Sequence, residues 1–451
     1  MNDTIAAIST PLGVGAISII RVSGDDAIEI VKKIYKGKDL SKVKSHTINY
    51  GHIYEKEKLI DEVLVSVMLK PNTFTKENIV EINSHGGIAT TNKILELLLS
   101  SGCRLAEPGE FTKRAFLNGR IDLIEAEGVM DLINAKTEKQ VELAVNQVNG
   151  YTSNLIKELR EKLVSIIANI NVNIDYPEYD DIKEVTNQDI LNKLEDIKKS
   201  INKVLNSSKD NQLINEGIKT AIIGSPNVGK SSILNKLLDE DKAIVTDIPG
   251  TTRDIVEGNI LINGIMLKII DTAGIRKTND YVENIGVEKS LNLINEADLI
   301  IYVLNNNEEI TEEEKNLYEQ IKNKKHLIII NKIDLPKKID YSSLDKNKII
   351  KISALDDNCI EIIKEKIKEL FNLEELNNID LTYLSNSRSI SLLNQSLEKI
   401  NEIEKSLKNE LPIDFIEIDL RSIWNILGEI IGETYKEELL DELFSRFCLG
   451  K

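Results

Sequence analysis

Cysteine and histidine are scarce in this chain of 451 residues, which has three of the former and four of the latter. Three cysteines in distant regions cannot form a disulfide framework, and neither residue type shows metal-ligand spacing. The longest apolar runs are as long as a strand, far too short to span a bilayer. No basic stretch precedes an apolar one at the start, so no secretory signal is expected. These absences favour a protein of the reducing cytoplasm, with no membrane partner.

Positive charge is also in short supply. The chain has 57 Lys and Arg against 74 Asp and Glu, a formal net charge of −17. Such a charge argues against a protein that coats RNA or a membrane, because polyanions are repelled on average. A local basic patch, or a basic partner, could still hold RNA. The length predicts two or three domains, and the apolar fraction of 41% is enough for their cores.

The hydrophobic pattern divides the chain into four parts. Residues 1–118 mix short strands rich in Val and Ile with helix. Residues 119–216 show helical spacing without strand signals, and helical spacing returns in residues 374–451. Between them, residues 217–373 alternate strand and helix. The expected fold class is α/β together with α. It comprises an N-terminal α+β domain, a discontinuous helical domain, and an inserted P-loop domain with a doubly wound, mostly parallel sheet.

Several elements can be placed more closely. In the N-terminal part, strands are predicted over residues 16–22, 62–69 and 79–82, and a helix over 88–99 that Gly102 ends. In the inserted part, strands are predicted over residues 219–223, 266–270, 299–304, 326–330 and 349–352. The apolar helix faces are predicted to comprise Val141, Ala144, Val145 and Val148; Ile156, Leu159, Leu163, Ile166, Ile167 and Ile170; Ile190, Leu194, Ile197, Ile201 and Val204; and Ile390, Leu393, Leu397 and Ile400.

The segment from Gly224 to Ser231, GSPNVGKS, matches the pattern of a phosphate-binding loop between a predicted strand and a predicted helix. Its glycines let backbone amides turn toward phosphate oxygens. Lys230 is expected to reach the β- and γ-phosphates, and the Ser231 hydroxyl to bind magnesium. A chance glycine-rich turn is the plain alternative, and the position between strand and helix argues against it.

Guanine recognition is indicated by Asn331 to Asp334, NKID, directly after an apolar strand. The Asp334 carboxylate can accept two hydrogen bonds from the guanine ring N–H and exocyclic amine, a pair that adenine does not offer. Sites built on such hydrogen bonds discriminate strongly between substrates. Ser353 to Leu355, after the next strand, would support the base through main-chain amides.

Two further motifs complete the pattern of a GTPase. Asp271 to Gly274, DTAG, ends a strand, where a magnesium-linked carboxylate and a γ-phosphate-sensing amide are expected. Thr252 lies between the motifs as the magnesium-binding switch threonine. Ile275 stands where small signalling GTPases carry a glutamine that orients water. Glu283 is a nearby carboxylate that could take that role, although it could equally be a solvated acid at a helix end.

The expected catalytic residues are therefore Glu283 and Lys230. The expected GTP-binding residues are Asn227, Val228, Gly229, Lys230, Ser231, Ser232, Thr246, Asp247, Ile248, Pro249, Gly250, Thr251, Thr252, Asp271, Thr272, Ala273, Gly274, Asn331, Lys332, Asp334, Ser353, Ala354 and Leu355. Magnesium is expected at Ser231 and Thr252.

Beyond these motifs, the chain resembles the MnmE (TrmE) family of bacterial tRNA-modifying GTPases over essentially its whole length. The resemblance rests on Pro108 to Asn118 (PGEFTKRAFLN), on Asp122 to Glu127, on Asp175 to Glu178 (DYPE), and on the last residues, Cys448 to Lys451 (CLGK).

The resemblance implies a GTP hydrolase that works with the flavoprotein MnmG, as a homodimer within a heterotetramer. Together they would add an aminomethyl or carboxymethylaminomethyl group to carbon 5 of the wobble uridine of certain tRNAs. A tetrahydrofolate derivative, in the 5-formyl or 5,10-methylene form, would supply the one-carbon unit. Dimerisation and folate binding would belong to the N-terminal domain.

By matching motif, the implied folate contacts are Arg21, Glu81, Arg120 and Lys451. Cations suit the glutamate tail of folate, and a carboxylate suits the N–H edge of the pterin. From the residues alone, each would be an ordinary surface charge. Cys448 could serve a structural or folate-covering role, or covalent catalysis.

The resemblance also implies a potassium ion at the nucleotide. Its ligands would be the Asn227 side chain and the carbonyls of Thr246, Ile248 and Thr251. A monovalent cation could then supply the positive charge that an arginine supplies in other GTPases. The plain alternative is that Asn227 only stabilises its own turn.

Two other functions share the GTPase motifs. A ribosome-assembly GTPase that binds ribosomal RNA without modification chemistry usually carries a Gly-x-x-Gly RNA-binding module or a second GTPase copy, and neither is present in this sequence. A nucleotide-switch scaffold would bind protein through its N-terminal domain. Folate binding by residues 1–119 separates these possibilities from the modification GTPase.

Overall fold

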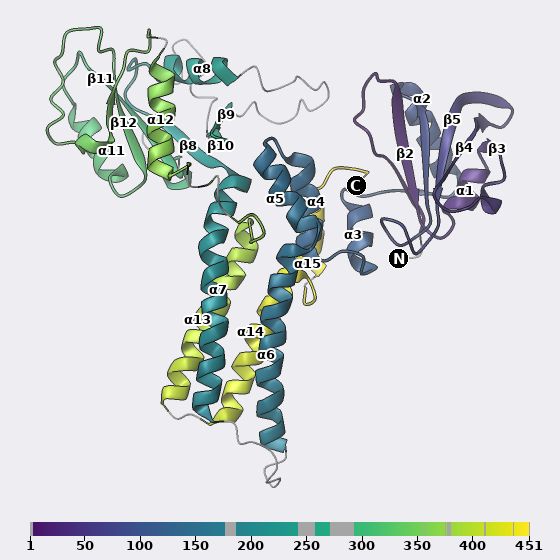
Figure 1. Cartoon of the computed structure of the whole chain (residues 1–451). Coiled ribbons are helices and arrows are strands. Elements are labelled where there is room, and N and C mark those ends of the chain that lie inside the picture. Colours follow the sequence, from purple (N-terminus) through teal and green to yellow (C-terminus); the bar gives the residue numbers. More distant parts are fainter. Residues whose placement is uncertain are drawn as a thin grey trace. The chain divides into compact units, whose positions relative to one another are not determined.

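The computed structural model describes residues 3–175, 186–241, 258–270, 293–356, 358–374, 376, 380–409, 412–435 and 437–450. The chain, whose helices and strands are labelled in Figure 1, separates into two compact units. The first comprises Met1–Asn134, Ala144–Ser200 and Leu392–Lys451, and the second comprises Ala135–Leu143 and Ile201–Ser391. The second is therefore inserted into the first, as the alternation of helical and α/β patterns predicts.

The N-terminal part of the first unit is built on a seven-stranded sheet of order β3-β4-β5-β6-β2-β1-β7. Neighbours are antiparallel except β1 and β7, which are parallel. The strands are β1 (Ile5–Ile8), β2 (Ile17–Ser23), β3 (Tyr35–Gly37), β4 (Thr47–Glu55), β5 (Lys58–Met68), β6 (Ile79–His85) and β7 (Arg104–Leu105). The helical elements are α1 (Ala27–Lys32), the short 3-10 helix η1 (Leu40–Lys42), α2 (Ile88–Ser101) and α3 (Glu110–Leu117).

One face of this sheet is covered, and the other is open toward β4 and β5 but is packed at β1 by Phe111 of α3. Alternate side chains of β5 and β6, such as Val65 and Ile82, are fully buried in a core that includes Ile94 and Leu98 of α2. Their neighbours on the opposite face, such as Leu64, are largely exposed. This alternation is the one expected when helices cover a single face of an antiparallel sheet.

The remaining helices of the chain's flanks range from 9 to 30 residues. They are α4 (Leu123–Asn134), α5 (Glu138–Val148), α6 (Tyr151–Asp175), α7 (Asn187–Glu216), α13 (Ser387–Lys408), α14 (Ile413–Ile431) and α15 (Glu437–Ser445). The predicted apolar positions of α6 and α7 are buried, which confirms those helix faces. Helices α6 and α14 pack along each other within the first unit. In the described residues, no helix is long and apolar enough to cross a membrane.

The predicted face of α5 is wrong in part. Val141 and Val145 are 41% and 38% exposed, whereas Leu143 and Ala144 are fully buried. Gln140 is also buried, because its amide donates to the Ile214 and Asn215 carbonyls at the end of α7 at 3.1 Å. Because the Gln140 side chain binds the carbonyls at the end of α7, α5 buries a face that includes Gln140, and Val141 and Val145 remain exposed.

The second unit contains a six-stranded sheet of order β13-β12-β11-β8-β10-β9, parallel except for β9. Its strands are β8 (Ile218–Ile223), β9 (Gly258–Ile262), β10 (Ile265–Ile269), β11 (Leu299–Asn305), β12 (His326–Asn331) and β13 (Ile349–Lys351). Its helical elements are α8 (Lys230–Asp241), α11 (Glu312–Ile321), η2 (Lys346–Lys348) and α12 (Cys359–Phe371).

Both faces of this sheet are buried. On β11, Ile301 and Val303 face a core shared with α8 and α12, whereas Ile300 and Tyr302 face a core shared with α11. Helices on both faces make the sheet doubly wound, as predicted. All five predicted strands of this unit are present, and β9 is an additional antiparallel strand that the alternation of strand and helix did not indicate.

Candidate functional site

The phosphate-binding loop leaves β8 at its carboxyl end and enters α8 at Lys230. Gly224 and Gly229 have φ angles of 147° and 102°, which L side chains rarely adopt. A Cβ at Gly224 would lie 2.3 Å from the Val303 carbonyl oxygen, and one at Gly229 would lie 2.2 Å from Asn331 Nδ2. The loop therefore needs both glycines for its curvature and for close packing against the sheet.

Lys230 extends back over this loop. Its ammonium group donates to the carbonyl oxygens of Gly224 and Ser225 at 2.8 and 2.7 Å. Ser231 follows it in the first turn of α8. Lys230 therefore sits at a helix N-terminus, inside the loop that would surround the phosphates of a nucleotide, where the helix dipole also favours an anion.

The base-recognition segments meet the loop at the ends of β12 and β13. Asn331, 1% exposed, donates to the Val228 carbonyl at 2.8 Å and accepts from the Ala354 amide at 2.9 Å. The Ser353 hydroxyl donates to Asp334 Oδ1 at 2.6 Å. One buried asparagine thus joins three motifs that are distant in sequence, and Ser353 orients the carboxylate that would read guanine.

These contacts refine the role expected of residues 353–355. The Ala354 amide is already used by Asn331, and the Leu355 amide donates to the Ser353 hydroxyl at 3.3 Å. The segment thereby fixes Asn331 and Asp334. Lys332 has a positive φ of 63° and donates to the Asn227 carbonyl at 2.7 Å, so that it too joins the two segments.

The structure brings together the expected nucleotide residues that lie in residues 227–232, 331–334 and 353–355. Other expected residues lie outside the described part of the chain: Thr246, Asp247, Ile248, Pro249, Gly250, Thr251, Thr252, Asp271, Thr272, Ala273, Gly274, Glu283 and Lys451.

A second candidate site is a cavity of about 330 Å³ in the first unit. Its lining residues are Arg21, Met68, Phe74, Ile79, Glu81, Thr112 and Val129. The volume lies within the range of small-molecule pockets, which are mostly apolar with a few well-placed polar groups. Two of the four expected folate contacts, Arg21 and Glu81, therefore line one cavity.

Arg21 and Glu81 face each other across β2 and β6, where they are register partners. Arg21 Nε donates to Glu81 Oε1 at 2.8 Å, and both side chains are about one-fifth exposed. The Arg21 guanidinium also lies 5.7 Å from the ring centre of Phe111 on α3. A partly exposed ion pair beside an aromatic ring offers both a cation and a carboxylate to a ligand.

Arg120 lies beside the same cavity rather than in its lining. Its guanidinium is 5.1 Å from the ring centre of Phe74 and donates to the Phe74 carbonyl at 3.4 Å. Phe74 belongs to a loop in which Lys76 has a positive φ of 58° and donates to the Gly119 carbonyl at 2.8 Å. Arg120 and Lys76 thus fix the aromatic wall of the cavity from outside.

The C-terminal segment docks at this cavity. The Gly450 carbonyl accepts from the Ser9 hydroxyl at 3.1 Å and from Arg21 Nη1 at 3.4 Å. The Gly109 amide donates to the Cys448 carbonyl at 3.3 Å. The last residues of the chain are thereby held beside Arg21, and the Cys448 side chain is exposed.

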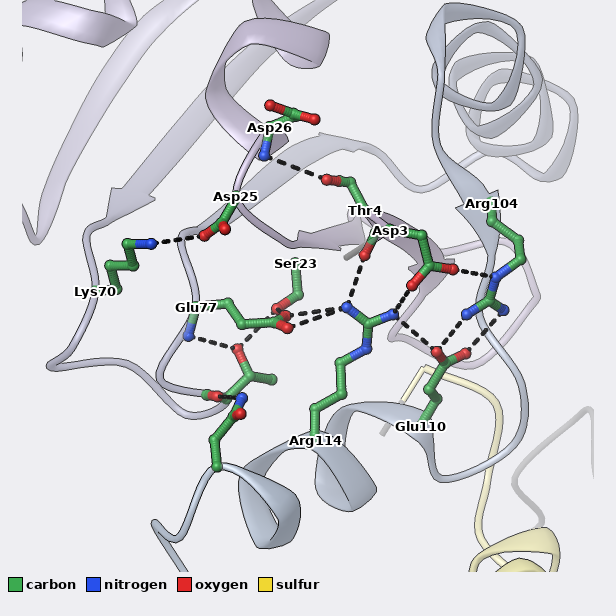
Figure 2. A network of polar contacts seen from close by, with 12 residues as sticks. Asp3, Thr4, Ser23, Asp25, Asp26, Lys70, Glu77, Arg104, Glu110 and Arg114 are labelled. Carbon is green, nitrogen blue, oxygen red and sulfur yellow. Dashed lines mark hydrogen bonds and ion pairs between the residues drawn. The ribbon is translucent and has the colours of Figure 1, made fainter. Parts of the chain in front are cut away.

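A polar network holds the elements around the cavity together (Figure 2). Arg114, 2% exposed on α3, points into a group of three carboxylates and donates to Asp3 and Glu110 at 2.8 and 2.9 Å and to Glu77 at 3.1 Å. Arg104 donates to Asp3 and to Glu110 from the other side. Because Glu77 lies in the loop that carries Phe74, this network connects that wall of the cavity to α3.

The network changes the acidity of its members. The hydrogen bond from Arg104 lowers the pKa of Asp3. Burial acts to raise the pKa of Glu110, but the hydrogen bonds from Arg104, from the backbone and from Arg114 outweigh it, so this pKa is also lowered. Both carboxylates are therefore held in their charged form.

Sequence reasoning missed the apolar lining, above all Phe74, Met68 and Val129, because apolar residues carry no chemical signal that separates a cavity wall from a core. It also missed the contacts of Ser9 and Gly450. The positive φ of Gly450, 89°, is a property that only the folded chain displays.

Comparisons with known proteins identify the family. A family model of the MnmE helical domain matches residues 123–448, and one of the N-terminus of the GTP-binding protein TrmE matches residues 4–120. The proteins called tRNA modification GTPase MnmE of Bacillus mycoides and Lactococcus lactis are each 52% identical to this chain and match all of it, covering 99% and 98% of their own lengths.

Among solved structures, the G domain of the FeoB iron transporter of T. maritima is 29% identical. It covers 34% of this chain and 98% of that chain, with a TM-score of 0.25. The full-length identity and the two family models, together with the assembled phosphate and base-recognition loops, show that this chain is a GTP hydrolase that belongs to the MnmE family.

Proposed function

We propose that this chain is a potassium-activated GTPase that acts with the flavoprotein MnmG. The pair would add an aminomethyl or carboxymethylaminomethyl group to carbon 5 of the wobble uridine of certain tRNAs. The observation that carries the proposal is the cavity at which the Arg21–Glu81 pair meets the C-terminal segment, in a chain 52% identical to proteins called tRNA modification GTPases.

The residues of the cavity fit a tetrahydrofolate derivative. Glu81 would accept from the N–H edge of the pterin, and the Phe74 ring would contact its face. Arg120 would pair with the glutamate carboxylates, and Arg21 would hold Glu81 in place through their ion pair. Lys451 follows Gly450 directly and would add a third cation. When bound, the folate supplies the one-carbon unit, while these residues orient it and the docked C-terminal segment limits the access of water.

Folate binding can be tested with Glu81→Gln, which keeps the shape of the side chain and removes its charge. Titration calorimetry with 5-formyltetrahydrofolate should show affinity reduced about tenfold or more, because a charge-assisted hydrogen bond is lost. Glu55→Gln is the matched control, since Glu55 is a partly exposed residue at the end of β4 that pairs with Lys93 of α2. Equal affinity in wild type and Glu81→Gln would contradict the assignment of Glu81.

At the nucleotide, Lys230 would stabilise charge on the β- and γ-phosphates, and Ser231 with Thr252 would hold magnesium. The Asn227 side chain, with the carbonyls of Thr246, Ile248 and Thr251, would hold potassium, and Glu283 would orient the attacking water. Support from the structure extends to Asn227, Lys230 and Ser231, which share one loop at the N-terminus of α8.

We also propose a homodimer formed through residues 1–118. The support is the open face of the sheet, where Ile17, Ile48, Tyr50 and Leu64 are exposed by 47–68%. Exposed apolar patches on a sheet commonly mark protein interfaces.

Residues 119–216 and 374–451 would form the helical domain and residues 217–373 the GTPase domain.

The chain's net charge of −17 bears on how tRNA is held. An acidic protein repels a polyanion, so the tRNA would contact a local basic patch or mainly the partner MnmG. Mass spectrometry of wobble nucleosides, after reaction with both proteins or with either alone, tests this division. Modified uridine formed by this chain without MnmG would contradict the proposed partnership.

A further inference from the structure

Glu314 belongs to none of the GTPase motifs, yet it contacts the phosphate-binding loop. Its side chain is 8% exposed at the beginning of α11. One carboxylate oxygen accepts from the Ser225 hydroxyl at 2.7 Å, and the other accepts from the Thr311 amide at 2.9 Å. Both oxygens are therefore used, one toward the loop and one toward the helix.

The helix side of this contact is firmly held. Thr311 and Glu314 form a capping box, in which the Glu314 amide donates to the Thr311 hydroxyl at 3.2 Å. The buried Tyr302 hydroxyl on β11 donates to the Glu314 carbonyl at 2.9 Å. A carboxylate in the first turn is also favoured by the helix dipole. Glu314 is thus fixed by interactions that do not involve the phosphate-binding loop.

The loop side leads to the catalytic lysine. Ser225 donates through its hydroxyl to Glu314, and its carbonyl accepts from the Lys230 ammonium at 2.7 Å. Its neighbour Gly224 lies against the Val303 carbonyl of β11, and the Gly224 carbonyl also accepts from the Lys230 ammonium. A fixed Ser225 therefore gives a fixed acceptor for Lys230.

We propose that Glu314 is a positioning residue for GTP binding and hydrolysis. It holds Ser225 so that the Ser225 carbonyl directs the Lys230 ammonium toward the phosphates. The role is exerted through Ser225 and concerns the nucleotide site, so it is independent of the proposed folate site. Positioned donors raise rates because no reorganisation is needed during the reaction.

The test compares four single variants of the full-length chain by affinity for a fluorescent GTP analogue, by kcat and KM, and by Tm. Ser225→Ala should lower nucleotide affinity about tenfold, the effect expected for a lost hydrogen bond to a charged group. Ser225→Thr keeps the hydroxyl and should bind the nucleotide with an affinity close to that of the wild type. Thr311→Ala weakens the helix cap and should lower Tm without this loss of affinity. Glu313→Gln, an exposed neighbour on the same turn, should leave both unchanged.

A double-mutant cycle of Ser225→Ala with Glu314→Gln completes the test, and the two losses of affinity should not add. Wild-type affinity in Ser225→Ala would overturn the proposal. Additive losses would overturn it as well, because the two residues would then act separately. An equal loss of affinity in Thr311→Ala would show that Glu314 acts only as a helix cap.

Discussion

At the scale of single residues, the nucleotide site depends on a few close contacts around Asn331. The Asn331 amide nitrogen donates to the Val228 carbonyl at 2.8 Å. A Cβ at Gly229 would lie only 2.2 Å from this nitrogen. The loop can approach the asparagine so closely only because position 229 has no side chain. The NKID segment therefore organises the phosphate-binding loop.

Replacement of Asp334 by asparagine tests guanine recognition. Asp334→Asn should weaken GTP binding by about 2 kcal/mol or more, because a charge-assisted pair is lost and an amide N–H would face the guanine donors. The variant should also accept xanthine nucleotide, whose exocyclic oxygen can accept from the new amide. Turnover measured at low GTP and at low XTP checks both expectations, and unchanged GTP turnover would refute the assignment.

Glu110 gives a prediction for pH. Its folded pKa is lowered, so its contribution to stability is complete above its unfolded pKa and is lost as pH falls through the lower folded value. Glu110→Gln should lower Tm by about 5 °C at pH 7, since about 2 kcal/mol of charged hydrogen bonding is lost.

The Tm difference between Glu110→Gln and wild type should shrink as pH is lowered from 5 to 3. Scanning calorimetry at several pH values measures it. Glu107→Gln, an exposed acid three residues earlier, is the control and should behave as wild type. A difference that stays constant down to pH 3 would show that the Glu110 charge does not stabilise the fold.

At the scale of elements, the C-terminal segment is held beside the cavity by the contacts of Gly450 with Ser9 and Arg21. Gly450 has a φ of 89°, and a Cβ there would lie 2.3 Å from the Ile8 carbonyl oxygen. Phe447, by contrast, packs in a small core with Phe444 and Phe116. The segment is therefore anchored by an aromatic core at one end and by a glycine contact at the other.

Gly450→Ala should release the end of this segment, because the added methyl group cannot be accommodated against the β1 backbone. Affinity for 5-formyltetrahydrofolate should fall about tenfold, through loss of the Gly450 contact with Arg21 and displacement of Lys451. GTP affinity should not change. Leu449→Ala, at a half-exposed neighbour, is the matched control. Truncation after Phe447 should reproduce the effect, and unchanged folate affinity in that truncation would remove Lys451 from the site.

At the scale of the whole molecule, the GTPase unit is inserted into a chain whose N-terminal sheet leaves an apolar face open. The open apolar face supports the homodimer proposed above. In that dimer, the carbonyls of Thr246, Ile248 and Thr251 would complete the proposed potassium site with Asn227.

GTP turnover should therefore require potassium, and turnover in sodium at equal ionic strength should be far lower. Asn227→Ala should abolish the difference, because one oxygen ligand is lost. Asn227 has a φ of 60°, which alanine disfavours, so Asn227→Gly is the control that removes the ligand without backbone strain. Equal wild-type rates in the two salts would defeat the cation mechanism. A potassium effect that survives in Asn227→Gly would place the ion elsewhere. Separately, light scattering measures the oligomeric state, and a monomer would contradict the proposed dimer.

The nucleotide chemistry and the order of domains could be predicted from the sequence. The phosphate-binding loop and the NKID segment each consist of a few consecutive residues after a buried strand. Their function can therefore be recognised from the order and spacing of those residues in the sequence. The same holds for the parallel strands, whose residues are apolar on both faces. The face of α5 could not be predicted, because the contacts of Gln140 with the end of α7, 74 residues away, outweigh the preference of Val141.

Only the tertiary structure decided what surrounds Arg21. Its partners are Glu81, 60 residues away, and Gly450, 429 residues away, and neither spacing carries a signal in the chain. The same is true of Glu314. In the sequence it is one of several acids of a helix, and only the packing of α11 brings it to Ser225, 89 residues away. Motifs determine chemistry that a short segment performs alone. Sites built by distant segments exist only once hydrophobic burial has paired the strands and helices that carry them.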